Sequence, residues 1–261
     1  MFVEISTTQN KNYKFIRSLK QKKERMKHKA FTVEGLKSVQ DAIDAGYGVE
    51  MLAMTDKFQT EAVFLPPAEI PCYVMPESMF PALCDTETPQ GILAVLRMRE
   101  EQTFSPDDTK LYLYCDAVSD PGNLGTIIRT ADAAGFGGVL LSDGCVDLYN
   151  PKTVRASMGS FFHIPVIEHI TKNQLSAWQY AGFQLLCGAL REETVNYIDA
   201  DMTKPTILAV GNEANGISEE ILQMADACVK IPICGRAESL NVGIAAAVLM
   251  YEAARQRDFY R

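Results

Sequence analysis

The stretch IPICGRAESLNVGIAAAVLMYE, residues 231–252, joins a short apolar strand to a long helix that is rich in alanine. The strand ends at Pro232, and a loop that contains glycine leads to Ser239–Asn241, where the helix begins. Ser239 or Asn241 fits a helix N-cap, because hydroxyl and amide oxygens accept hydrogen bonds from the first free N–H groups of a helix. Ligands of open parallel sheets bind beyond the carboxyl ends of the strands. The stretch therefore predicts a buried strand, a ligand-binding loop and a packed helix in succession.

Outward from this stretch, the chain from Leu111 onward alternates between short apolar runs and amphipathic segments. Near-continuous apolar strands that alternate with helices predict an α/β fold with a parallel sheet covered on both faces. The expected strands are Leu111–Ala117, Val139–Leu141, Ile164–Ile167, Phe183–Cys187, Thr206–Val210 and Cys228–Ile231. The expected helices are Leu124–Ala134, Lys172–Ala181, Ser218–Met224 and Val242–Arg257.

Two further loops follow expected strands and carry polar residues. In residues 116–136, DAVSDPGNLGTIIRTADAAGF, a strand leads through a turn into a helix whose free N–H groups could receive a phosphate, although Pro-Gly-Asn alone predicts only a turn and a cap. In residues 208–217, LAVGNEANGI, Asn212 and Glu213 lie at a strand tip beside Gly211, and glycine permits close backbone approach to a ligand. We expect all three loops to meet at one edge of the sheet.

The expected helix Leu124–Ala134 shows one apolar stripe. Its members follow the helical spacing and are Leu124, Ile127, Ile128, Ala131 and Ala134. Arg129 lies about 100° around the helix from Ile128 and points away from the stripe. Asp120 or Asn123 can cap this helix. The pattern predicts that Arg129 faces solvent, a partner subunit or a ligand.

The first hundred residues have a different pattern. A basic helix precedes a second helix near Glu34–Ala45, the apolar runs Glu61–Leu65 and Cys72–Met75, and a last strand at Gly91–Met98. The polar stretch Arg99–Lys110 contains proline and indicates a linker. The chain is therefore expected to have two parts.

Charge is distributed unevenly along the chain. Residues 11–29, KNYKFIRSLKQKKERMKHK, contain seven Lys, two Arg and one Glu, which gives +8. The whole chain has a formal charge of −8, so the remainder carries −16. This asymmetry suggests one local anionic partner, which nucleic acid satisfies, although a solvated charge-rich helix has the same pattern.

Composition excludes several classes of protein. The 261 residues are 47% hydrophobic and 22% charged, an ordinary balance for a globular chain. The N-terminus lacks the apolar segment of a secretory signal, and no apolar run is long enough to cross a membrane. The seven cysteines are widely spaced without a C-x-x-C pair, which indicates reduced thiols in the cytoplasm. The three histidines lack metal-ligand spacing, so we expect no metal.

The three loops together resemble the motifs of the SpoU/TrmH-type RNA ribose 2′-O-methyltransferases of the SPOUT superfamily. The first motif, N-x-G-x-x-x-R-x-A…G-F/A-G, is matched by Asn123, Gly125, Arg129, Ala131, Phe136 and Gly137. The second, G-x-E-x-x-G-I, is matched by Gly211, Glu213, Gly216 and Ile217. The third, I-P-M-x-G…S-L-N-V-S-x-A…Y-E, is matched by Ile231, Pro232, Gly235, Ser239, Leu240, Asn241, Val242, Ala245, Tyr251 and Glu252.

The resemblance covers about Leu111–Arg257 and implies a fold. A C-terminal SPOUT domain, residues 110–261, would contain the parallel sheet and a deep trefoil knot. Residues 1–103 resemble the smaller L30e-like α/β domain that binds RNA in this family, with cues in the basic helix, in Val33–Gly35 and in Thr88–Gly91. Knots are nearly absent from proteins, so this one follows from the resemblance alone.

The resemblance also implies a reaction. A methyl group would move from S-adenosyl-L-methionine to a ribose 2′-hydroxyl of rRNA or tRNA. Carried over by position, the cofactor-binding residues are Leu208, Gly211, Ile231 and Leu240. The catalytic residues are Arg129, Asn123, Glu213, Ser239 and Asn241, and Arg129 would come from the partner subunit of a homodimer. The basic helix would hold RNA through Lys20, Lys22, Lys23 and Arg25.

The motifs contain no histidine to activate the 2′-hydroxyl. The family proposal gives the role of general base to Arg129, but arginine is effectively always protonated in proteins. A charged Arg129 that stabilises the developing alkoxide and grips the adjacent phosphate is physically easier. Asn123, Glu213, Ser239 and Asn241 would orient the ribose and hold Arg129.

Two positions depart from the family pattern, since Ile233 replaces a methionine and Gly243 replaces a second serine. The lost hydroxyl at Gly243 leaves open an alternative, a non-catalytic RNA-binding protein on a SPOUT scaffold. A Rossmann-type enzyme fits poorly, because the dense glycines at Gly135–Gly138 follow a helix rather than the first strand. Binding of S-adenosylmethionine would discriminate between the enzyme and the RNA-binding protein.

Overall fold

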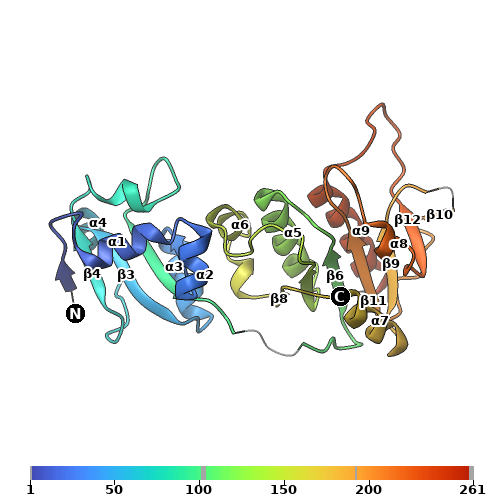
Figure 1. Ribbon diagram of the computed structural model, residues 1–261, viewed down its shortest axis with the longest axis horizontal. Helices are drawn as coiled ribbons and strands as arrows, with labels where there is room; N and C mark the ends of the chain where they lie inside the picture. Colours follow the sequence, from blue (N-terminus) through green and yellow to red (C-terminus); the bar gives the residue numbers. More distant parts are fainter. Residues whose placement is uncertain (1, 101–103, 192, 259–261) are drawn as a thin grey trace. The chain divides into compact units, whose positions relative to one another are not determined.

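The computed structural model describes residues 2–100, 104–191 and 193–258, and the chain forms two compact units (Figure 1). Unit 1 comprises Met1–Gln102 and Tyr149–Phe162, and unit 2 comprises Thr103–Leu148 and His163–Arg261. The units differ from the predicted division at one place, because Tyr149–Phe162 groups with the N-terminal residues.

Unit 1 contains a five-stranded mixed sheet with the strand order β1-β4-β3-β5-β2. Its strands are β1 (Phe2–Glu4), β2 (Ala30–Glu34), β3 (Val49–Thr55), β4 (Cys72–Met75) and β5 (Ile92–Arg97). β1, β4 and β3 are parallel, whereas β5 runs antiparallel to both β3 and β2. The strand predicted at Gly91–Met98 is confirmed. The apolar run Glu61–Leu65 forms no strand, since Glu61 ends the helix α4 (Asp56–Glu61) and Val63 and Leu65 are exposed.

The basic segment of unit 1 forms two helices rather than one. Asn10 caps α1 (Lys11–Ser18) by accepting hydrogen bonds from two backbone N–H groups, and a short turn leads to α2 (Lys22–His28). The second expected helix is α3 (Leu36–Asp44), which starts two residues later than predicted because Glu34 ends β2. A short 3₁₀ helix, η1 (Phe80–Leu83), precedes β5.

Tyr149–Phe162 packs on unit 1 through aromatic side chains. This segment contains α6 (Pro151–Ala156) and the 3₁₀ turn η2 (Ser160–Phe162). The ring of Phe31 in β2 lies 4.9 Å from that of Tyr149 and 5.6 Å from that of Phe161. The sequence pattern did not predict this docking, because the aromatic partners lie far apart in the chain.

Unit 2 contains a seven-stranded, all-parallel sheet with the order β10-β12-β9-β11-β6-β7-β8. Its strands are β6 (Leu111–Cys115), β7 (Gly138–Leu141), β8 (Val166–Ile167), β9 (Gln184–Gly188), β10 (Thr194–Asn196), β11 (Thr206–Val210) and β12 (Ala227–Lys230). All six predicted strands are confirmed, β11 with the predicted bounds and the others with shifted ends, and β10 is an additional edge strand. Because the strands are parallel, the loops that follow β6, β9, β11 and β12 lie at the same edge of the sheet.

Helices cover both faces of this sheet. On one face, α7 (Lys172–Tyr180) and α8 (Glu219–Leu222) contribute Leu175, Trp178 and Ile221 to a core that also includes Tyr114 and Ile207. On the other face, α9 (Val242–Gln256) contacts β11 and β9 and packs against α5 (Pro121–Ala133). The apolar stripe predicted on α5 is buried, with Leu124, Ile127, Ile128 and Ala131 inaccessible to solvent.

Candidate active site

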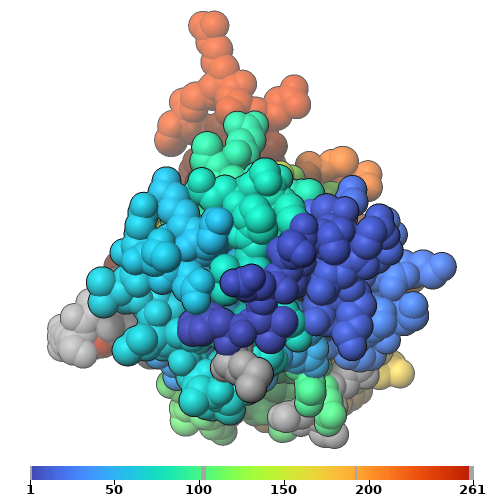
Figure 2. All heavy atoms as spheres, turned by 90° about the vertical axis from the view of Figure 1, so that its left-hand side faces the viewer, coloured from blue at the N-terminus to red at the C-terminus, as the bar shows by residue number. Residues whose placement is uncertain are grey.

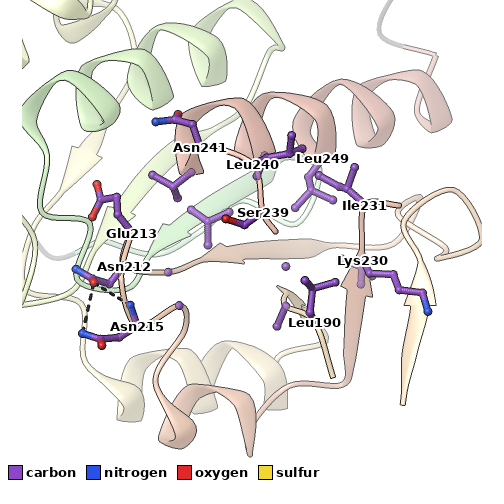
Figure 3. Close-up of a pocket in the computed structure, with 18 of the residues that line it drawn as sticks. Leu190, Asn212, Glu213, Asn215, Lys230, Ile231, Ser239, Leu240, Asn241 and Leu249 are labelled. Atoms are coloured by element: carbon purple, nitrogen blue, oxygen red, sulfur yellow. Dashed lines mark hydrogen bonds between the residues drawn. The ribbon is translucent and has the colours of Figure 1, made fainter. Parts of the chain in front are cut away.

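A pocket of about 570 Å³ lies in unit 2 beyond the carboxyl ends of β9, β11 and β12 (Figure 3). This volume is typical of small-molecule sites, which range over roughly 300–1,000 Å³. Figure 3 shows Glu213 and Asn241 on one side of the pocket and Leu190 and Ile231 on the other. The lining residues come from 188–190, 210–216, 229–231, 233, 239–242, 245 and 249. The pocket thus lies where three parallel strands end and α9 begins.

The carboxylate of Glu213 joins the loop after β11 to the loop after β6. Its Oε2 accepts hydrogen bonds from the backbone nitrogen of Ser119 at 3.0 Å and from the Ser119 hydroxyl at 2.8 Å. Its Oε1 accepts from the backbone nitrogen of Asp120 at 3.1 Å and from Nδ2 of Asn123 at 2.9 Å. Donors therefore contact both carboxylate oxygens, and Glu213 holds the two loops together.

These hydrogen bonds keep Glu213 ionised. Burial raises the pKa of its carboxyl group, but hydrogen bonds from Asn123 and Ser119 outweigh burial and lower the pKa to about 2. Such a shift is expected, because hydrogen bonds donated to the charged form favour that form. With this pKa the carboxylate is ionised at neutral pH, and its hydrogen bonds connect the loops that carry Ser119, Asp120 and Asn123.

A chain of amide side chains extends from Glu213 to the start of α9. Nδ2 of Asn241 donates to Oδ1 of Asn123 at 2.9 Å, and Asn123 in turn donates to Glu213. Oδ1 of Asn241 accepts from the backbone nitrogens of Gly243 at 2.9 Å and Ile244 at 3.3 Å, so Asn241 is the N-cap of α9. The structure thus brings together Asn123, Glu213 and Asn241 from three separate motifs.

The loop after β11 makes a tight turn that requires glycine. A Cβ atom on Gly211 would lie 2.1 Å from the carbonyl carbon of Gly216, which no side chain tolerates. Asn212 and Gly216 exchange backbone hydrogen bonds at 2.9 Å, and Nδ2 of Asn212 donates to the carbonyl oxygen of Ala117 at 2.8 Å. The backbone of this loop therefore forms a fixed wall of the pocket.

The remaining predicted catalytic residues occupy different places. Ser239 lines the pocket from the segment before α9. Arg129 is exposed on α5, on the side opposite its buried stripe, and does not line the pocket of its own chain. The N-cap of α5 is Asp120, which accepts from the backbone nitrogen of Asn123 at 2.8 Å. Within a single chain, Arg129 is therefore not part of the pocket.

Three of the predicted cofactor-binding residues, Gly211, Ile231 and Leu240, line the pocket. The fourth, Leu208, is fully buried in the middle of β11, where it pairs with Leu113 of β6 and does not reach the pocket wall. The reason is the length of β11, which continues for two residues after Leu208 before the loop begins.

The motifs did not identify one wall of the pocket. Gly188 at the end of β9 and the two residues after it, Ala189 and Leu190, line it, and Leu190 is 65% exposed. The signal was weak, because the lining residues Gly188–Leu190 are glycine, alanine and leucine and carry no polar side chain. Asn212 was placed at a strand tip but was not predicted to brace the loop against Ala117.

The predicted RNA-binding residues of unit 1 divide into two pairs. Lys22 and Lys23 are exposed on α2. Arg25 is 3% exposed, and its guanidinium donates to the carbonyl oxygens of Leu19 and Lys20. The prediction that Arg25 contacts RNA at the surface is therefore corrected. Nζ of Lys20 donates to the carbonyl oxygen of Cys84 at 2.6 Å and is likewise engaged within unit 1.

Other features of the described residues bear on the class of site. Among residues 2–100, 104–191 and 193–258, no helix has the length and apolar character needed to span a membrane. The same residues contain no group of three or more His, Cys, Asp or Glu side chains placed to hold a metal ion. All seven cysteines are free thiols.

The model of the SpoU rRNA Methylase family matches residues 110–251, and that of the MRM3-like substrate binding domain matches residues 10–94. The chain belongs to the SpoU rRNA methylase family. This SpoU methylase is 38% identical over 248 residues to the 23S rRNA (guanosine(2553)-2′-O)-methyltransferase of Bacillus subtilis, with 95% of this chain and 98% of the relative covered. The resemblance drawn from the motifs is thus confirmed.

Solved structures of related methyltransferases have the same fold as this chain. An AdoMet-bound rRNA methyltransferase from Sinorhizobium meliloti matches with a TM-score of 0.87 at 35% identity, covering 97% of this chain and 98% of that one. The SpoU methyltransferase AviRb from Streptomyces viridochromogenes, in complex with AdoMet, matches with a TM-score of 0.83 at 27% identity, covering 96% and 100%. The predicted fold class is confirmed as a SPOUT methyltransferase fold with an all-parallel sheet, preceded along the chain by a smaller α/β substrate-binding domain.

Proposed function

We propose that this chain is an S-adenosylmethionine-dependent methyltransferase that modifies a ribose 2′-hydroxyl of ribosomal RNA. The observation that carries the proposal is the pocket at the edge of the parallel sheet, where Asn123, Glu213 and Asn241 of the three family motifs meet. Ribosomal rather than transfer RNA is supported by the Bacillus subtilis relative, which matches over nearly its whole length and is named for 23S rRNA.

The pocket fits S-adenosylmethionine. Its wall combines apolar side chains, among them Leu190, Ile231 and Leu249, with the backbone of the loop that begins at Gly211. Apolar walls with a few placed polar groups are typical of cofactor sites, and the turn at Gly211 brings backbone atoms close to the pocket. When bound, the cofactor supplies a methyl group carried on a positively charged sulfur.

In this proposal the residues of this chain position the acceptor, and Glu213 holds its neighbours in place instead of acting as a base. Because Glu213 is held by Ser119 and Asn123, it fixes the amide of Asn123, which in turn holds Asn241. Ser239 presents a hydroxyl beside this chain of amides. Preorganised donors of this kind lower the barrier because they need no reorganisation as charge develops.

Arg129 acts on the site of the other subunit in a homodimer. Support comes from its exposed position on α5 and its absence from the lining of its own pocket. The guanidinium stabilises the developing alkoxide and binds an adjacent phosphate, since charge-assisted hydrogen bonds to arginine are strong and bidentate.

Mixing Arg129→Ala chains with Glu213→Ala chains tests this shared site. Exchange of subunits should restore roughly a quarter of the wild-type sites, because half the dimers are mixed and each mixed dimer has one complete site. No recovery after verified subunit exchange would refute the shared site.

The two domains have separate tasks in this proposal. Residues 1–103 bind the RNA, and residues 110–261 form the methyltransferase domain, a division supported by family models at residues 10–94 and 110–251. Within unit 1, exposed Lys22 and Lys23 contact phosphate. The free thiols fit a reducing compartment, and we place the protein in the cytoplasm.

Comparison of ribosomal RNA from cells with and without this chain tests the function. We expect one 2′-O-methylated nucleotide to disappear from the RNA of cells that lack the chain and to return with a plasmid-borne copy. The same nucleotide should stay unmodified with a Glu213→Ala copy. An unchanged methylation map in all strains would contradict the proposal.

A further inference from the structure

A second hollow, of about 580 Å³, lies in unit 1 beside α4. Its wall is formed by the end of β3, α4, η1 and the residues that precede β5. The apolar part of the wall consists mainly of rings, those of Phe58, Pro81 and Pro89, together with Phe80, which is only 2% exposed. Flat rings and prolines offer surfaces against which another flat ring can stack. The shape and chemistry of the wall therefore suit a planar heterocycle.

The charges of this hollow are unlike those of the basic helices. Glu61 and Glu77 line it together with one cation, Lys57, whose Nζ lies 3.9 Å from Oε1 of Glu77. These three side chains carry a net charge of −1, which disfavours a phosphate group. The carboxylate of Glu61 is exposed at the end of α4 and can accept hydrogen bonds from a ligand. The hollow thus favours a neutral ring that presents N–H donors.

The wall is held in shape without a ligand. Oγ1 of Thr55 accepts from the backbone nitrogen of Phe58 at 3.0 Å, which caps α4. Gly91 has φ of +81°, and a Cβ atom there would lie 2.8 Å from Oγ1 of Thr55. Oε1 of Gln90 accepts from the backbone nitrogen of Leu36 at 3.1 Å. A preformed site loses less conformational entropy on binding than a flexible one.

The surface around the hollow is open and partly apolar. Figure 2 shows the cyan and turquoise surface of the chain from β3 to the start of β5 facing the viewer beside the dark-blue surface of α1. Val63 and Leu65, which follow α4, are almost fully exposed. These two side chains add apolar surface beside the hollow that a ligand can contact. RNA bound to unit 1 would have access to this open surface.

We propose that the hollow beside α4 binds one unpaired guanine of the RNA substrate, with the ring stacked on Phe58 and its N1–H and N2–H groups donating to Glu61. This inference rests on the proposed function, because it takes RNA as the substrate. Sequence-specific recognition of RNA mostly targets unpaired bases, which stack on aromatic side chains and are distinguished by their Watson–Crick edges. Guanine is the base that offers two adjacent donors on that edge, which matches the two oxygens of a carboxylate.

Binding of short RNAs to the full-length protein tests the proposal. The probes are heptauridine and the same heptamer with one central guanosine, measured by fluorescence anisotropy at one salt concentration. We expect the guanosine probe to bind roughly tenfold more tightly, in the range of one stacked base. Phe58→Leu, which keeps apolar volume but removes the ring, and Glu61→Gln, which keeps size but removes the charge, should each abolish most of this preference. Gln59→Ala, on the same helix outside the hollow, is the matched control and should keep it.

Equal binding of the two probes by the wild type would overturn the proposal, as would a preference that survives both Phe58→Leu and Glu61→Gln. Loss of the preference in Gln59→Ala as well would also overturn it, since the effect would then belong to the helix and not to the hollow. The readout needs no methyl transfer, so failure of the proposed function, seen as no transfer by the same preparation, is distinguishable from failure of this site.

Discussion

In the pocket of unit 2, the carboxylate of Glu213 is fixed by Ser119, Asp120 and Asn123, whereas Lys22 and Lys23 of unit 1 are exposed side chains on a short helix. The first region depends on geometry, because each hydrogen bond requires a particular donor at a particular position. The second depends on charge, which acts over about 10 Å at ordinary ionic strength. Mutations in the pocket should therefore change the rate of methyl transfer, and mutations in the basic helices should change the affinity for RNA.

The largest expected effect is that of Arg129→Ala. Transfer should fall by roughly 10²–10³-fold, as for the loss of one donor that stabilises developing charge. Affinity for S-adenosylmethionine, measured by calorimetry, should stay within about twofold, because Arg129 does not line the pocket of its own chain. Arg155→Ala, which removes another exposed arginine, is the control. Wild-type turnover by Arg129→Ala would remove this residue from the mechanism.

Glu213→Gln should have the next largest effect. The substitution keeps the shape but places an amide NH₂ group against the donors Ser119, Asp120 and Asn123. We expect transfer to fall roughly tenfold to a hundredfold, since small displacements of catalytic groups have effects of this size. Glu220→Gln, which affects only an exposed pair with Lys172, should keep its activity. Single-turnover kinetics separates this loss of rate from a loss of RNA binding.

The stabilising effect of Glu213, measured against Glu213→Gln, should depend on pH. The pKa of Glu213 is about 2 in the folded protein, against 4.5 for an unperturbed glutamate. Its contribution to stability is therefore complete above about pH 4.5 and is lost as the pH falls toward 2. The difference in unfolding free energy between wild type and Glu213→Gln should shrink over that window. A constant difference down to pH 2 would contradict the lowered pKa.

Lys22→Ala/Lys23→Ala should have a smaller effect and only on RNA affinity. Each lost phosphate contact reduces the slope of log affinity against log salt by roughly 0.7–0.9, so the double variant should lower it by about 1.5. Lys172→Ala/Lys204→Ala, which removes two exposed lysines of unit 2, should leave the slope unchanged. Arg25→Met should instead lower the melting temperature with little change in slope, because this arginine is buried. A changed slope in Arg25→Met alone would reverse this division.

The smallest effect is expected for Gly243→Ser, which restores the usual serine of the family. A Cβ atom there would lie 3.2 Å from Oδ1 of Asn241 and 3.4 Å from Cγ2 of Thr126, so the fit is tight. We expect a loss of about 1 kcal/mol in unfolding free energy and a change in transfer of less than about threefold. Gly243→Ala separates the added carbon from the hydroxyl. A tenfold gain of activity with serine alone would show that the missing hydroxyl limits this enzyme.

The middle of the unit 2 sheet was predictable because β6, β7 and β11 are buried on both faces and stand out as apolar runs. The edge strand β10 was missed because it is short and partly exposed. The site was predictable where the motifs carry polar residues, as at Asn123, Glu213 and Asn241. Leu190 was missed because an apolar residue in a loop gives no signal of a ligand. The burial of Arg25 was missed because its partners are backbone carbonyls of a helix turn, which no side-chain pattern shows. The trefoil knot, the L30e likeness of unit 1 and the roles of the site residues stay predictions.

The decisive measurement is transfer of labelled methyl from S-adenosylmethionine to ribosomal RNA that lacks this chain's modification, followed by nucleoside analysis. Methylation of a ribose predicts label in one 2′-O-methylated nucleoside with the wild-type protein and a loss of nearly all label with Arg129→Ala. Label on a base, or clear cofactor binding with no label in any RNA fraction, would contradict it.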